Sequence, residues 1–159
     1  MTTTSYINRT LIENVKLTNF RGTFASDNIP PTRKCYYRES FIVNLDESNM
    51  PGSHWIAITF RREKNGSRSC FYFDPLADQT INANISIYIS KFSDRICRNV
   101  VKIQDDKSVY CGLFCMAFVM YVDKRANKCE PNFTRPYAKK KLLTNDRKVV
   151  HYILKQINK

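Results

Sequence analysis

The segment from residue 111 to 122, CGLFCMAFVMYV, is the strongest constraint on how this chain can fold. It carries no charged residue and is apolar almost all round, which is typical of a helix buried on every side. Such a helix needs other elements packed around it, and the chain can supply them. Because 43% of its 159 residues are hydrophobic and 13% aromatic, a disordered or low-complexity architecture is excluded.

Two strand candidates accompany this helix. His54–Phe60 and Cys70–Asp74 are rich in β-branched and aromatic residues and flank a polar KNGS turn, which predicts a hairpin. Periodicity also predicts strands over 39–45 and 100–103 and helices over 6–15 and 81–96. A last amphipathic helix is predicted to follow Thr144 or Asn145 as its N-cap, with Val149, Val150, Ile153, Leu154 and Ile157 on one side. The prediction is an α+β fold in one domain, residues 1–159, with a mixed or antiparallel sheet packed against the helix that starts at Cys111.

The cysteines and the absence of long apolar runs predict an intracellular protein that is not secreted. No apolar run reaches signal-peptide length near the start, and none reaches the roughly 18 residues of a membrane helix. We therefore expect no membrane association. The six cysteines are widely spaced without a CxxC pair, so we also expect mostly free thiols and no metal site. They stand at positions 35, 70, 97, 111, 115 and 129.

The charge of the chain is concentrated at its C-terminal end. The formal net charge is +12, and residues 124–159 hold eleven Lys and Arg against Glu130 and Asp146, so 11 − 2 = +9 falls in this basic helical part. A skew of this kind predicts affinity for polyanions, nucleic acid first. The alternative is a merely solvated basic face.

Cys111 is the best candidate for a nucleophile. A thiolate attacks carbonyl carbon, and a helix N-terminus or a positive neighbour can lower a thiol pKa from ~8.5 to about 3.5–7.5. Cys111 is predicted to begin the buried helix, and Gly112 is expected to allow close approach of a substrate and to leave backbone amides available for an oxyanion.

The general base must come from one of two histidines, and His54 is the candidate because it opens a predicted strand. Asp74 closes the next strand and is its expected orienting acid. If residues 62–66 form a five-residue connection, residue 54 pairs with residue 74 on one face, ~5 Å apart at Cβ. A two-residue Asn65–Gly66 turn would instead send the two side chains to opposite faces.

A family resemblance joins these residues. His-Trp at 54–55, Phe-Asp-Pro at 73–75, Gln104 and Cys-Gly-Leu-Phe-Cys at 111–115 resemble the adenovirus protease family, the adenains, within the superfamily that includes SUMO proteases. The segment around Gly22–Phe24 is also similar. The resemblance covers roughly residues 20–123 and implies a papain-like fold, a Cys-His-Asp triad of Cys111, His54 and Asp74, and Gln104 as an oxyanion donor. Asp74 replaces the adenain glutamate, as in SUMO-type proteases.

The resemblance implies a cysteine endopeptidase that cuts next to small residues, glycine first, in viral structural precursor proteins during virion maturation. It implies a monomer in the host nucleus, the viral factory or the virion. No cofactor is needed for the chemistry, but DNA, bound through the basic C-terminal part, or an activating peptide is expected to stimulate it. Cys97 lies in a region loosely comparable to the adenain cysteine that joins such a peptide.

Two other functions stay open. The first is a peptidase for ubiquitin-like proteins, favoured by Asp74. The second is an inactive, basic nucleic-acid-binding protein on the same scaffold, against which the complete set of His54, Asp74, Gln104 and Cys111 argues. Trp55 and Cys115 are interpreted as packing residues, and His151 as a surface or edge residue of the last helix.

Overall fold

The computed structural model describes residues 2–33, 37–124, 130–137 and 141–158 and is built on a five-stranded mixed sheet. The strands lie in sequence order, and the two outer pairs are parallel whereas the two inner pairs are antiparallel. Their bounds are β1 Phe20–Ala25, β2 Arg38–Asn44, β3 Trp55–Arg62, β4 Arg68–Phe73 and β5 Arg95–Arg98. The expected α+β class with a mixed sheet is confirmed.

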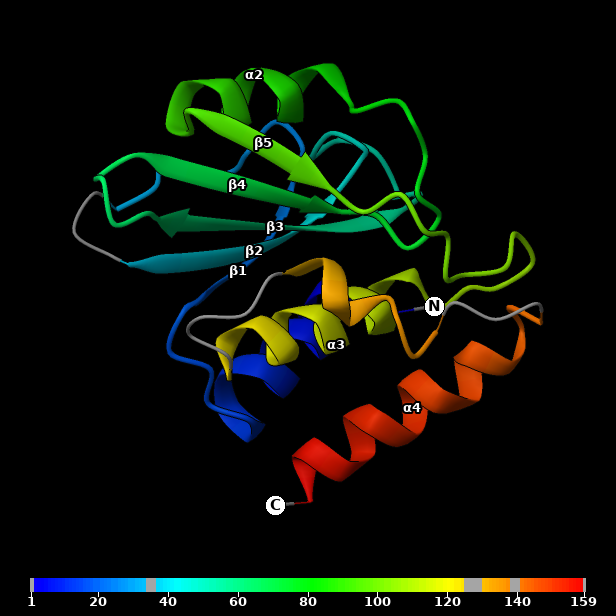
Figure 1. Ribbon diagram of the computed structural model, residues 1–159. Coiled ribbons are helices and arrows are strands. Elements are labelled where there is room, and N and C mark those ends of the chain that lie inside the picture. Colours follow the sequence, from blue (N-terminus) through cyan, green and yellow to red (C-terminus); the bar gives the residue numbers. More distant parts are fainter. Residues whose placement is uncertain (1, 34–36, 125–129, 138–140, 159) are drawn as a thin grey trace.

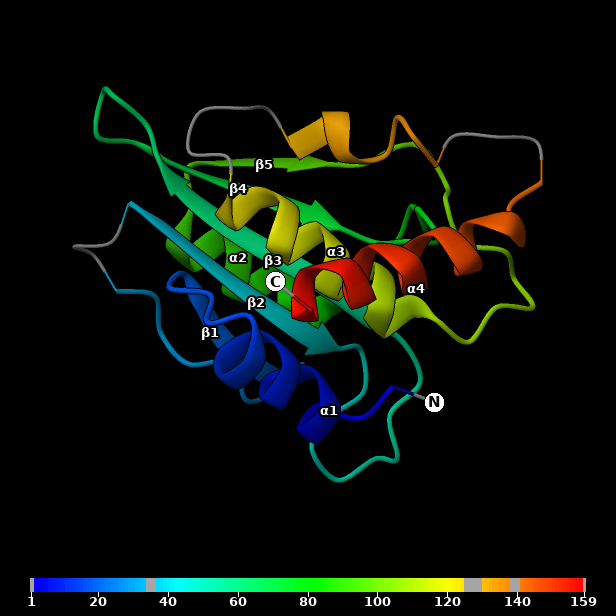
Figure 2. The same ribbon diagram turned by 90° about the horizontal axis from the view of Figure 1, so that it is seen from below.

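Helices cover both faces of this sheet (Figure 1). One face holds α1 (Thr4–Asn8), which continues into the π-helix η1 (Arg9–Asn14), together with α3 (Cys111–Asp123) and α4 (Thr144–Ile157). The opposite face holds α2 (Ala83–Phe92). Figure 1 shows α3 between the sheet and α4, as expected of a helix that is apolar all round, and Figure 2 shows the N-terminal helix, α3 and α4 in front of the strands with α2 behind them. A short 3-10 helix, η2 (Glu130–Phe133), completes the elements of the described residues.

Strand alternation divides the core into two layers. Trp55 and Ala57 of β3 face α3, whereas Ile56, Ile58 and Phe60 face α2. Both sets are buried, which explains why this strand reads as a continuous apolar run rather than an alternating one. On the α3 side, Phe118 stacks against Phe73 of β4 with ring centroids 4.5 Å apart. α3 is therefore fixed directly on the central hairpin.

Three expectations about local structure are wrong. The helix predicted over 81–96 ends at Phe92, because Ser93 is extended and Ile96 belongs to β5. Residues 100–103 form no strand. Neither Thr144 nor Asn145 caps α4, whose N-cap is Leu143 without a side-chain hydrogen bond. Asn145 is instead fully buried, and its Nδ2 donates to the carbonyls of Ile103 and Tyr137 at 2.8 Å each, so tertiary contacts override its capping preference.

No helix in the described ranges is long and apolar enough to cross a membrane.

A buried carboxylate anchors the face of the sheet that carries α2. Glu39 of β2 has no exposed surface and contacts three arginines, with Arg21 Nη1 at 2.7 Å, Arg33 Nε at 2.9 Å and Arg68 Nη2 at 3.3 Å. The Arg33 backbone N–H also donates to it at 2.9 Å. Removing the charge of this buried group would take away the carboxylate that the three arginines share.

We therefore expect Glu39→Gln to lower the free energy of unfolding by about 3–5 kcal/mol, measured by urea denaturation. The control is Asp106→Asn, which removes the carboxylate of the exposed Lys102–Asp106 ion pair and should cost at most about 1 kcal/mol. Equal losses for the two variants would contradict a structural role for the buried network.

Candidate active site

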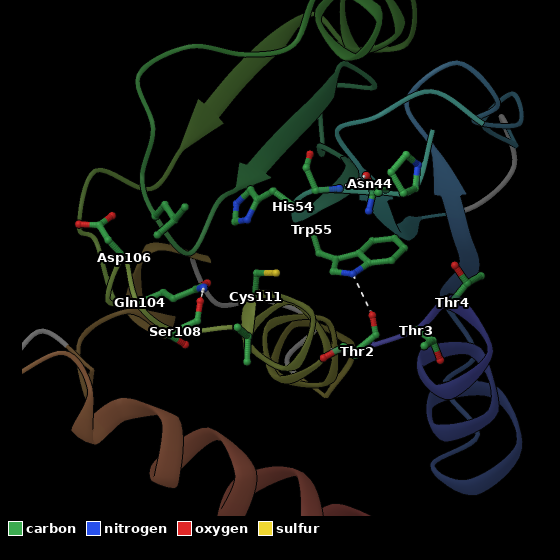
Figure 3. A pocket seen from close by; sticks show the side chains of 15 residues that line it. Thr2, Thr3, Thr4, Asn44, His54, Trp55, Gln104, Asp106, Ser108 and Cys111 are labelled. Carbon is green, nitrogen blue, oxygen red and sulfur yellow. Dashed lines mark hydrogen bonds between the residues drawn. The ribbon is translucent and has the colours of Figure 1, made fainter. Parts of the chain in front are cut away.

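The three predicted triad residues converge where the start of α3 meets the open end of the β3–β4 hairpin, and Figure 3 shows two of them, His54 and Cys111, on the wall of one pocket. Cys111 is the first residue of α3 and is 9% exposed, at the edge of a pocket of about 450 Å³. His54 lies directly before β3 and lines the same pocket, and Asp74 follows β4. Each group thus stands at the end of a regular element, where the sheet or helix fixes the backbone. The side chains of His54 and Cys111 face the pocket, whereas that of Asp74 is buried beside His54.

The imidazole of His54 is held by the carboxylate of Asp74. The Nε2–Oδ1 distance is 2.7 Å, and Asp74 is only 2% exposed. The carboxylate also accepts backbone N–H bonds from Leu76 at 2.9 Å and Asp78 at 3.2 Å. These bonds fix the carboxylate, which in turn fixes the orientation of the ring.

Asn99 supports this pair and was missed by sequence reasoning. Its Oδ1 accepts the backbone N–H of Asp74 at 2.9 Å, and its Nδ2 donates to the Asp74 carbonyl at 2.7 Å. A lone asparagine after a short strand gives no sequence signal for such a role, because its partner lies 25 residues away.

The hairpin register differs from the predicted one in a way that preserves the site. Arg62 pairs with Arg68 and Ala57 with Phe73, so the five-residue connection is 63–67 rather than 62–66. The expected longer loop is therefore present, and Gly66 adopts the left-handed conformation it needs, with φ +85°. The pairing is displaced by two residues, so His54 and Asp74 remain on one face as diagonal neighbours.

The thiol and the imidazole perturb each other's protonation. Burial alone would lower the pKa of His54, but its side-chain hydrogen bonds with Asp74 and Cys111 and their negative charges raise this pKa to about 9. Burial would likewise raise the pKa of Cys111, but hydrogen bonds from His54 and from the Trp55 and Gly112 amides lower it. The arrangement favours a thiolate–imidazolium pair at neutral pH.

Gln104 lies in the same pocket, beside Cys111 (Figure 3). It is 2% exposed, and its Nε2 donates to the Ser108 carbonyl at 2.9 Å. The backbone N–H groups of Ile103 and Gln104 both donate to the Pro75 carbonyl, which ties this segment to the end of β4 next to Asp74. A glutamine amide has two N–H groups, so one remains for an oxyanion.

The N-terminal segment forms one wall of the pocket, and no sequence pattern predicted this role. Residues 2–4 line it, and the Trp55 indole N–H donates to the Thr2 carbonyl at 3.2 Å. A Cβ added at Gly112 would stand 2.8 Å from the Thr2 side chain. The glycine was expected to admit a substrate, but what approaches it is the chain's own Thr2. Trp55 is buried, as a packing residue should be, yet it also holds this wall.

The remaining candidates lie apart from this chemistry. Cys97 is a half-buried free thiol on β5, and His151 is exposed on α4. Cys35 and Cys129 lie outside the described residues. In the part of the chain that the structure describes, no group of three His, Cys, Asp or Glu side chains is placed to hold a metal ion.

An activated cysteine at the start of a buried helix, facing a His–Asp pair on an adjacent hairpin, defines a cysteine-peptidase-like fold. A family model described as YopJ serine/threonine acetyltransferase matches residues 7–150, and the chain belongs to this family. The match supports the broader adenain and SUMO-protease-like superfamily, but not the finer expectation of an adenovirus protease.

Among solved structures, the chain is similar to the crystal structure of the Se-Met ASFV pS273R protease. The two are 16% identical with a TM-score of 0.46, and the likeness covers 76% of this chain. It covers 43% of the ASFV protein, so this chain spans less than half of that protein's length. Comparison with curated proteins gives no match.

The ion pair makes a prediction about thiol reactivity. We expect iodoacetamide to alkylate Cys111 at pH 6 at least about tenfold faster than an ordinary thiol with a pKa of ~8.5. The rate should rise with pH as the lowered Cys111 pKa is passed, and it should not fall near pH 9 where His54 loses its proton, because the thiolate remains. Mass spectrometry of the labelled peptide measures the rate.

His54→Ala should move the midpoint of this profile to higher pH, because the largest influence that lowers the Cys111 pKa is gone. The matched control is His151→Ala, which removes the exposed histidine of α4. Superimposable profiles for wild type and His54→Ala would contradict the ion pair.

Proposed function

We propose that this protein is a cysteine peptidase that hydrolyses amide bonds through an acyl-enzyme on Cys111. The observation that carries the proposal is the position of His54 between the Asp74 carboxylate and the Cys111 thiol. This arrangement supplies a thiolate for attack and a protonated imidazole for the leaving group, which are the two species that amide cleavage requires.

The mechanism follows from these groups. The Cys111 thiolate attacks the scissile carbonyl carbon and forms a C–S bond, while Gln104 Nε2 and the Cys111 backbone N–H stabilise the oxyanion. His54 gives its proton to the leaving nitrogen as the C–N bond breaks. His54 then takes a proton from water, which attacks the thioester, and the C–S bond breaks to restore the thiolate.

The substrate proposal is a polypeptide with a small residue, glycine first, at the reacting carbonyl. Thr2, Trp55 and Gly112 support it because they crowd one side of the nucleophile. We further propose that the physiological substrates are viral structural precursors and that DNA bound to the basic C-terminal part activates the enzyme. These two proposals rest on the adenain-like motifs alone. A ubiquitin-like protein ending in Gly-Gly would satisfy the same steric limit.

A second candidate is acyl transfer to a serine or threonine hydroxyl. The match of residues 7–150 to the YopJ serine/threonine acetyltransferase family favours it. Both reactions share the acyl-Cys111 intermediate and differ in the group that attacks it. Hydrolysis is placed first because water needs no binding site, whereas transfer needs sites for an acyl donor and for the hydroxyl acceptor.

Cys111→Ala should lower peptide cleavage by at least about 10³-fold, and Gln104→Ala should lower kcat by about 10²–10³-fold through the loss of an oxyanion donor. Gln79→Ala, which changes an exposed glutamine, is the control for the second variant. Cleavage is followed by mass spectrometry on a mixture of glycine-containing peptides and Gly-Gly-terminated ubiquitin-like proteins.

The same mixture, supplied with an acyl thioester and serine- and threonine-containing peptides, separates the two candidates. Cys111-dependent cleavage supports the peptidase. Cys111-dependent mass gain on hydroxyl-bearing peptides, with no cleavage, would replace it by the transferase. Salt-sensitive DNA binding with neither reaction would instead establish the inactive nucleic-acid-binding protein.

A further inference from the structure

We infer that the substrate polypeptide extends from Cys111 along an apolar groove that crosses the start of α3 and reaches α4. The enzyme would thereby select bulky apolar side chains on one side of the scissile bond. The inference rests on the proposed peptidase function and goes beyond it by assigning a specificity surface.

Three adjacent hollows line the path of this groove, and neighbouring hollows share residues. The active-site pocket of about 450 Å³ shares Thr2, Thr3 and Val109 with a second hollow of about 380 Å³. The second hollow shares Tyr110 with a third of about 430 Å³, which is lined by Val150 and Leu154 of α4. An extended chain that enters at Cys111 could therefore cross Val109 and Tyr110 and place successive side chains in the three hollows.

The residues along the groove are unusually exposed for their type. Val109 is 58% exposed and Tyr110 38%, although they immediately precede the nucleophile, and Leu154 on α4 is 50% exposed. Clustered apolar exposure beside a reactive group marks a binding surface more often than chance does. A substrate side chain would remove this surface from water at about 25 cal/mol per Å².

Polar groups on the groove walls favour a polypeptide over a hydrocarbon chain. Thr2 and Thr3 line the part near Cys111, and Asp146 and Arg147 line the part at α4. A hydrocarbon would cover these groups without offering hydrogen bonds, which is costly. A peptide backbone presents an N–H and a C=O at each residue and can pair with them while its apolar side chains contact Val109 and Leu154.

The test uses a library of peptides derived from a digested proteome, with cleavage sites read by mass spectrometry. Wild type should show enrichment of large apolar residues on one side of the cut. For a long cleaved peptide, the double variant Val109→Ser, Leu154→Ser should raise KM about tenfold and change kcat less than twofold. The same variant should show weaker enrichment of large apolar residues beside the cut.

The matched control is Val100→Ser, Ile87→Ser, which changes one loop valine and one helical aliphatic residue that are 78% and 70% exposed and lie outside the groove. No apolar enrichment in wild type, or equal KM values for the two double variants, would overturn the inference. The inference would also be overturned if the double variant Val109→Ser, Leu154→Ser left KM and the cleavage pattern unchanged and altered only the self-association of the protein, measured by light scattering. Selective alkylation of Cys111 without apolar enrichment would reject the groove while leaving the nucleophile proposal standing.

An independent contact concerns Cys115, and we propose that it is a positioning residue for the nucleophile. Its Sγ–H donates to the Trp55 carbonyl at 3.2 Å. The backbone amide of the same Trp55 helps to lower the pKa of Cys111, and Trp55 adjoins His54 in the sequence. Cys115 therefore ties the helix that carries the thiolate to the strand that carries its base.

The burial of Cys115 keeps this donor in place. The side chain has no exposed surface, and burial together with the nearby Cys111 and Asp74 charges raises its pKa well above the usual value. Its thiol thus stays protonated while that of Cys111 ionises.

Cys115→Ala should slow alkylation of Cys111 at pH 6 about three- to tenfold and move the midpoint of the pH profile upward. Cys115→Ser, which keeps a donor, should restore most of the rate. Cys70→Ala is the control because Cys70 is equally buried, but in the core layer on the other face of the sheet. If Cys115→Ala matched Cys70→Ala in its pH profile, Cys115 would be a packing residue only.

Discussion

The burial of α3 along most of its length is the constraint on which the rest of the structure depends. An apolar helix without a polar side must be enclosed, and here the sheet, η1, α4 and the 130–137 segment enclose it. The middle of the helix has almost no exposed surface, its C-terminal end is half-buried at Tyr121 and Asp123, and at its first residue Cys111 keeps 9% exposure at the edge of the pocket. A helix N-terminus carries unpaired N–H groups and partial positive charge, so the end of the helix that meets the pocket is also the end suited to a thiolate.

The base is tied to this point by the same packing. Phe73 of β4 stacks on Phe118 of α3, and Trp55 at the start of β3 faces α3 as well. His54 and Asp74 are the next residues outward along these two strands. The core contact that stabilises the fold thus also sets the separation of thiol, imidazole and carboxylate, and a change in hairpin register by one residue would have broken both.

The sequence was sufficient for the parts of the site that follow from strand parity and helix burial. His54, Asp74 and Cys111 could be expected together, because an even displacement of the register leaves the two hairpin residues on one face. The β5 strand could not be expected, since RICR does not alternate and Ile96 continues the spacing of α2 by coincidence. Asn99, Asn145 and Thr2 act through partners distant in the chain, which no local pattern encodes.

The two cysteines of α3 show how far environment decides chemistry. Cys111 and Cys115 stand one helical turn apart, yet their pKa values move in opposite directions. Hydrogen bonds to His54 and to backbone amides lower the pKa of Cys111, whereas full burial and the nearby negative charges of Cys111 and Asp74 raise that of Cys115. The same electrostatics links the two halves of the proposed reaction. Once Cys111 is acylated, its charge no longer supports the His54 proton, so the His54 pKa must fall from about 9. The imidazole then becomes a base for whichever acceptor, water or hydroxyl, enters the pocket.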